Sequence, residues 1–232
     1  MIRKVLHISD WHTQNIEGML SKYQSAWGPD LILVTGDMVK DMPGFLTKKD
    51  SEEGRAEMGK WQRAIWVSQA QSIGRIFPGV PIVAVPGNHD FCDYSIDGLV
   101  QSFDDGTQTF VVNDIRITGF RGVPYICNWW SYELEMKAFK KLIRELDPKA
   151  DILVTHSPPF GALDIVERRE KGVRPFYIHV GIEGLKEWLI KHPTVQLHAF
   201  GHIHNSGGKT EQWYGTTLSN ASCSLNEILI DV

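Results

Sequence analysis

Ile82-Val83-Ala84-Val85-Pro86-Gly87-Asn88-His89-Asp90 is the stretch that decides the fold of this chain. Its first four residues are apolar and mostly β-branched, which predicts a short strand buried on both faces of a sheet. Pro86-Gly87 ends the strand, because proline donates no ladder hydrogen bond and glycine favours a turn. Asn88 and His89 are therefore expected at the carboxyl end of a buried strand.

The same arrangement, a short apolar run followed by polar residues, occurs four more times along the chain. The runs are 5–8 before Ser9-Asp10-Trp11-His12, 31–34 before Thr35-Gly36-Asp37, 152–154 before Thr155-His156, and 197–200 before Gly201-His202-Ile203-His204.

Helical patterns separate several of these runs. We expect helices over 50–76, with Asp50 and Glu53 as a capping box, over 132–146 and over 184–191. Residues 109–112 and 115–118 read as a hairpin, and 215–232 as one or two further strands. Strands that alternate with helices predict an α/β layered fold, here as a single domain over 1–232.

Composition narrows the class of protein. A chain of 232 residues with 42% hydrophobic and 22% charged residues is typical of a globular domain. A net charge of −4 gives no overall basic field for nucleic acid. The sequence has no apolar run long enough for a membrane span, and its three cysteines form no C-x-x-C pair. Because no long apolar segment follows the two positive charges at residues 3 and 4, a secretory signal is not expected. A cytoplasmic location and free thiols are predicted, without an indication of oligomeric state.

The polar residues at the strand ends suit metal binding. Carboxyl ends of strands in an open α/β sheet converge on one crevice, so imidazole, carboxylate and amide ligands should meet there. Each fragment alone could be an ordinary turn, with a hydrogen-bonded histidine. Five such fragments offer too many ligands for one ion, whereas two ions about 3.5–4 Å apart that share a carboxylate would use them all.

These motifs resemble the five motifs of the calcineurin-like metallophosphoesterase superfamily. They are Asp10-Trp11-His12, Gly36-Asp37, Gly87-Asn88-His89-Asp90, Thr155-His156 and Gly201-His202-Ile203-His204. The resemblance implies two mixed β-sheets packed as a sandwich flanked by helices, with the metal site at the strand ends. It also implies one ion held by Asp10, His12 and His204, a second held by Asn88, His156 and His202, Asp37 between them, and His89 facing the leaving group.

A narrower resemblance concerns the later motifs. Thr155-His156-Ser157-Pro158-Pro159-Phe160-Gly161, Asp164, residues 197–204 and residues 219–222 are similar to the small metallophosphoesterase-domain proteins, which are associated with phosphodiester and cyclic-nucleotide hydrolysis. Residues 8–12 also resemble the DNA-repair exonucleases. Lys40 stands where the protein phosphatase branch has the Asp of its Asp-Arg-Gly, which argues against that branch.

The predicted function is a phosphoesterase that hydrolyses small, nucleotide-like phosphodiesters by attack of a hydroxide bridging two ions. Manganese is the favoured metal, with iron, zinc, nickel or cobalt as alternatives. The alternatives in function are a DNA or RNA nuclease and a phosphomonoesterase. A binding scaffold without chemistry would need lost ligands, and here all eight positions are filled.

Some residues near the motifs have weaker predictions. Arg121 and Asn15 are candidates to bind phosphate, and either Asp41 or Asp90 could orient His89. Tyr125, Trp129 and Trp130 could stack on a base or serve as packing, whereas His7 and His198 are expected in the core.

Overall fold

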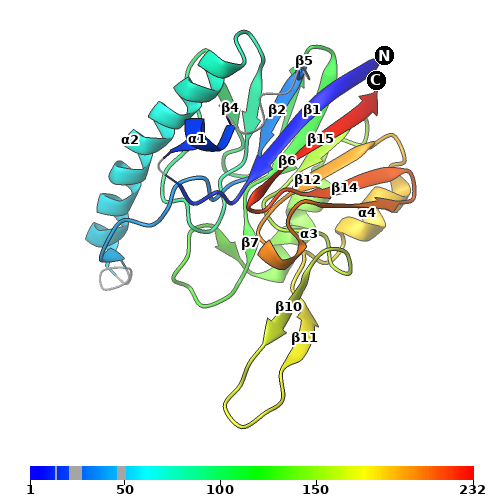
Figure 1. Ribbon diagram of the computed structural model, residues 1–232. Helices are drawn as coiled ribbons and strands as arrows, with labels where there is room; N and C mark the ends of the chain where they lie inside the picture. The colour runs from blue at the N-terminus through cyan, green and yellow to red at the C-terminus, as the bar shows by residue number, and fades with distance from the viewer. Residues whose placement is uncertain (14, 21–27, 46–50) are drawn as a thin grey trace.

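The apolar strands build two mixed sheets in the computed structural model, which describes residues 1–13, 15–20, 28–45 and 51–232 (Figure 1). The first sheet has the order β15-β1-β2-β3-β4, with bounds Ser224–Asp231, Ile2–Ser9, Leu31–Val34, Ile82–Ala84 and Val100–Ser102. The second has the order β13-β14-β12-β9-β6-β5, with bounds Lys209–Trp213, Thr216–Asn220, Leu197–Phe200, Ile152–Val154, Ile115–Phe120 and Thr107–Val112.

Continuous apolar strands form because each sheet is covered on both faces. Leu31 and Leu33 pack in the core between the sheets, together with Val154 from the opposite sheet. Their neighbours Ile32 and Val34 face the other way, into the core under the helices. The predicted sandwich flanked by helices is confirmed.

Helices cover both outer faces (Figure 1). Their bounds are Ile16–Leu20 for α1, Glu52–Ile76 for α2, Met136–Arg144 for α3 and Leu185–Lys191 for α4, followed by the 3₁₀ turn η3 at His204–Ser206. Two small sheets pair β7 (Val123–Pro124) with β8 (Glu133–Leu134), and β10 (Ile165–Arg168) with β11 (Phe176–His179). The β10–β11 hairpin projects from the sandwich in Figure 1. No helix within the described ranges is long and apolar enough to cross a membrane.

Two predicted helix starts differ from the structure. The side chain of Ser51 caps α2 by accepting a hydrogen bond from the Gly54 amide at 3.0 Å, whereas the predicted capping residue Asp50 lies outside the described residues. The prediction that the next helix begins at residue 132 is wrong. Residues 133 and 134 pair with β7 as a strand, so the helix begins only at Met136.

The parallel strands bring the predicted site residues to one edge. β1, β2 and β3 are parallel neighbours in the first sheet, as are β9 and β12 in the second. The segments after these five strands therefore leave the sandwich on the same side.

Two histidines lie inside the strands and are fully buried, as predicted. His7 contacts the hydroxyls of Ser219 and Thr35 at 2.8 and 2.9 Å. His198 Nε2 lies 2.8 Å from the hydroxyl of Thr155, which itself donates to a backbone carbonyl and must therefore accept from the ring. His198 Nδ1 then carries no proton, and burial together with the nearby His7 lowers the pKa of His198 to about 3.

We expect the free energy of unfolding to decrease as the pH falls below about 6.5, because the unfolded chain then binds protons that buried His198 does not. The His198→Gln variant keeps a side-chain N–H donor but does not titrate. Between about pH 6.5 and 4.5, the free energy of unfolding of this variant should fall less steeply than that of the parent. The two slopes should differ by up to roughly 1 kcal/mol per pH unit. Urea unfolding of both proteins in the presence of a chelator measures this, and equal slopes would contradict the assignment.

Candidate metal centre

The structure brings together all eight side chains that the motifs predict. Each stands at or just after the end of one of the five parallel strands, and each contacts at least one other member. The set is Asp10, His12, Asp37, Asn88, His89, His156, His202 and His204.

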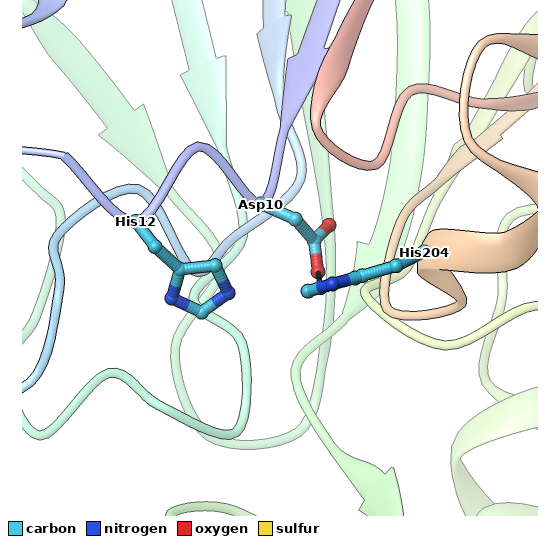
Figure 2. A group of neighbouring side chains, drawn as sticks. All are labelled: Asp10, His12 and His204. Atoms are coloured by element: carbon cyan, nitrogen blue, oxygen red, sulfur yellow. Dashed lines mark hydrogen bonds and ion pairs between the residues drawn. The ribbon is translucent and has the colours of Figure 1, made fainter.

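One group of possible metal ligands consists of Asp10, His12 and His204, whose ligand atoms lie within 4.8 Å of one another (Figure 2). Asp10 Oδ1 lies 3.2 Å from His204 Nε2. The other oxygen, Oδ2, accepts hydrogen bonds from the hydroxyls of Ser9 and Ser222 at 2.5 and 3.1 Å. The buried carboxylate is thus held in place on one side and faces two imidazoles on the other.

A second group consists of Asp10, Asp37 and His156, so Asp10 belongs to both groups. His156 Nδ1 lies 2.6 Å from the Thr35 carbonyl, which can only accept, so this nitrogen carries the proton. His156 Nε2 faces two further acceptors, Asn88 Oδ1 at 3.1 Å and Asp37 Oδ2 at 3.4 Å. When His156 is neutral, these three atoms are all acceptors, so a positive charge is needed between them, either a proton on Nε2 or a metal ion.

Electrostatics point the same way. Burial by itself lowers the pKa of His156, but the charge of Asp37 and the hydrogen bond with it outweigh burial and raise that pKa to about 9. Burial opposes ionisation of Asp37, yet the facing His156 holds the pKa of the carboxyl well below its usual range. His202 lies beside this pair, with its ring centroid 5.0 Å from that of His156. This set of imidazole, carboxylate and amide ligands fits a divalent transition metal.

The backbone turns sharply at four of these residues. Asp10, His12, Asp37 and His202 have φ values of 53°, 42°, 53° and 69°. Left-handed backbone costs a residue with a Cβ roughly 1–2 kcal/mol, and such residues gather at functional sites. These turns follow β1, β2 and β12 and carry four of the eight clustered side chains.

Two glycines precede ligands where strand ends come very close. A Cβ at Gly87 would lie 2.3 Å from Asp37 Oδ1 and 2.5 Å from the His156 ring. A Cβ at Gly201 would lie 2.1 Å from Asp10 Oδ2. Neither position tolerates any side chain without displacing a possible ligand.

His89 stands at the side of the two groups. Its Nδ1 lies 3.1 and 3.2 Å from the carboxylate oxygens of Asp41, so of the two residues predicted to orient it the structure selects Asp41. Burial lowers the pKa of His89, but the hydrogen bond with Asp41 and the nearby carboxylates outweigh it and raise the pKa to about 9. The rings of His12 and Trp130 flank it, with centroids 5.0 and 4.1 Å away.

Asp90 binds backbone groups of the two neighbouring strand ends. Its Oδ2 accepts the backbone N–H groups of Asp37 and Gly87, both at 2.7 Å, and its Oδ1 accepts from the Tyr94 hydroxyl at 2.7 Å. Asp90 thereby ties the ends of β2 and β3 together beneath the ligands.

The family model for calcineurin-like phosphoesterases matches residues 3–206, a range that includes all eight clustered side chains. This chain is a calcineurin-like phosphoesterase. Metallophosphoesterase domain-containing protein 1 of human and of mouse are each 28% identical to it over 119 residues. That match covers 49% of this chain and 34% of either relative, so the match spans about a third of their length.

Among solved structures, the phosphopantetheinyl hydrolase of Mycobacterium tuberculosis superposes with a TM-score of 0.51 at 14% identity. The superposition covers 97% of this chain and 95% of that protein. At this identity the likeness shows a shared fold, the metallophosphoesterase fold that the motifs predict.

The two residues predicted to bind phosphate have other partners in this phosphoesterase. The Arg121 guanidinium pairs with Asp105 and, at 3.8 Å, with Asp104, and it lies over the Tyr132 ring. Asn15 Oδ1 accepts the Gly18 amide at 2.9 Å. Phosphate binding by Arg121 and Asn15 stays a prediction.

Sequence reasoning missed the residues that support Asp10 and His156. Ser9, Ser222 and the Thr35 carbonyl hold these side chains, although each lies within or next to a motif of the phosphoesterase. Their position beside a predicted ligand was the available signal, since metal ligands need partners that fix their orientation.

We expect Gly87→Ala and Gly201→Ala to weaken binding of Mn²⁺ at least tenfold, because the added methyl displaces Asp37 and His156 or Asp10. Gly28→Ala is the matched control, since a Cβ there meets nothing within 4 Å. Isothermal titration calorimetry measures affinity, and circular dichroism verifies folding. Unchanged affinity in both folded variants would show that these strand ends do not hold the metal.

Proposed function

We propose that this phosphoesterase hydrolyses small, nucleotide-like phosphodiesters with two divalent ions, Mn²⁺ being the favoured metal. The observation that supports it best is the pair of adjacent ligand groups beside His89, in which carboxylate oxygens of Asp10 and Asp37 lie within 4.8 Å of one another. One ion would be held by Asp10, His12, Asp37 and His204, and the other by Asp37, Asn88, His156 and His202.

The bound ions would supply Lewis acidity, which lowers the pKa of water towards about 7 and neutralises charge on the phosphate oxygens. The buried carboxylates of Asp10 and Asp37 supply the negative charge that retains two dications. Asn88 adds an oxygen ligand without charge, so the site does not become too negative for an anionic substrate.

His89 is assigned as the general acid. Its Nδ1 donates to the Asp41 carboxylate, which fixes the ring between His12 and Trp130 and stabilises the protonated form. When the bond between phosphorus and the leaving oxygen breaks, the proton on Nε2 passes to that oxygen. Asp41 remains an ionised carboxylate throughout and orients the donor.

A diester fits the charged groups around the site better than a monoester. A monoester dianion calls for an extra cation, yet Arg121 is already paired with Asp104 and Asp105. Lys40 stands where the protein phosphatases have the Asp of their Asp-Arg-Gly pattern. The match to metallophosphoesterase domain-containing protein 1 agrees with the narrower resemblance of the later motifs.

With Mn²⁺ added, we expect a higher kcat/KM for bis(p-nitrophenyl) phosphate than for p-nitrophenyl phosphate, because the predicted phosphate-binding cation, Arg121, is already paired with Asp104 and Asp105. Exhaustive chelation should abolish both activities, and Mn²⁺ should restore them. A tenfold preference for the monoester would identify a phosphomonoesterase instead. Poor turnover of both esters, with salt-sensitive cleavage of single-stranded DNA, would identify a nuclease.

We expect His89→Asn to lose about 10²–10⁴-fold in kcat/KM on a dinucleotide, because a nucleoside alkoxide needs a proton to leave. The loss on bis(p-nitrophenyl) phosphate should be much smaller, because p-nitrophenolate leaves without one. Asp41→Asn, which keeps a side chain that can contact the ring, should show the same pattern with smaller losses. Metal content is measured for each variant. Equal losses on both esters with metal retained would remove His89 from the acid role.

A further inference from the structure

A cavity of about 430 Å³ borders the candidate metal centre. His202 and Ile203, at the end of β12, form one part of its wall. The remainder comes from the segment after β7, from the loop after β9 and from the base of the β10–β11 hairpin. This volume lies in the range of small-molecule sites, and because His202 lines it, the cavity lies next to the candidate metal ligands.

The wall of the cavity is mainly aromatic and aliphatic. Tyr125, Ile126 and Phe160 line it, and these three side chains are 54%, 44% and 42% exposed. The backbone of Phe160 is fixed, because its N–H donates to the Ile182 carbonyl at 3.1 Å. An aromatic side chain that is partly exposed thus lines the cavity beside a polar centre.

One polar side chain on this wall is held in place by a buried partner. His179 Nδ1 lies 2.6 Å from Oδ1 of Asp164, which is itself fully buried. Asp164 Oδ2 accepts the backbone N–H groups of Gly161 and Gly181 at 3.0 and 3.1 Å, so the carboxylate acts as an acceptor and His179 Nδ1 donates to it. The ring therefore presents its opposite edge, Nε2, as the polar edge left for a ligand, and its centroid lies 5.2 Å from that of Phe160.

We propose that this cavity binds a planar heteroaromatic group, such as a nucleobase, attached to the phosphate that the metal centre cleaves. Phe160 supplies a stacking face, and His179, oriented by Asp164, supplies a hydrogen bond to the edge of the ring. Arg168 and Glu183 add a donor and an acceptor on the same wall. The assignment rests on the proposed function, because it needs the scissile phosphate at the metal centre.

The test compares two diesters that release the same p-nitrophenolate and differ only in the other substituent. These are thymidine 5′-(p-nitrophenyl phosphate) and methyl p-nitrophenyl phosphate, assayed with Mn²⁺. The parent should prefer the thymidine ester in kcat/KM by roughly tenfold or more, mainly through KM, since stacking of a base on an aromatic ring contributes on that scale.

Two variants examine the assigned residues. Phe160→Ala removes the stacking face, and His179→Asn keeps an N–H donor for Asp164 but removes the far edge of the ring. Each should lower the preference for the thymidine ester severalfold with metal content unchanged. Tyr214→Ala, an exposed aromatic residue in the turn after β13 that does not line the cavity, is the control and should keep the preference of the parent.

Each remaining outcome decides a separate point. Equal cleavage of both esters by the parent would leave the diesterase function standing and overturn the base site. A preference that survives in both variants would also overturn it, since the base would then bind elsewhere. If neither ester is cleaved, the proposed function fails, and calorimetric binding of adenosine 5′-monophosphate against ribose 5-phosphate then tests the cavity. Equal affinities would overturn the proposal.

Discussion

The close approach of strand ends from two sheets is the constraint on which the rest of this molecule depends. Gly87 and Gly201 lie so near Asp37, His156 and Asp10 that no side chain fits between them. The packed core between the sheets holds the strands at this spacing, and close-packed interiors deform little. The ligands are consequently positioned by rigid strands and by the turns that end them.

Buried negative charge is the second consequence of this arrangement. Asp10 and Asp37 are almost fully removed from water, where an unpaired carboxylate is costly. Hydroxyl groups of Ser9 and Ser222, backbone N–H groups and the facing imidazoles satisfy part of their bonding. Ligand atoms of Asp10, Asp37 and His156 lie within 4.8 Å of one another, and a metal cation between them would stabilise this arrangement.

The candidate metal centre and the groups around it come from different parts of the fold. All candidate ligands stand at strand ends, whereas Trp130, Phe160 and the Asp164–His179 pair come from the loops and the hairpin around the centre. Connecting segments are the parts of a fold that vary most readily. The phosphopantetheinyl hydrolase of Mycobacterium tuberculosis, at 14% identity, shares the fold.

The sequence by itself determined the strands, their polar ends and the identities of the eight clustered side chains. It did so because buried strands read as continuous apolar runs, and because parallel strands must end at the same edge. Only the tertiary structure decided which carboxylate orients His89, that Arg121 pairs with Asp104 and Asp105, and that Asp164 holds His179 at a cavity. These contacts join loops whose paths are set by packing rather than by periodicity, so no local pattern of residues encodes them.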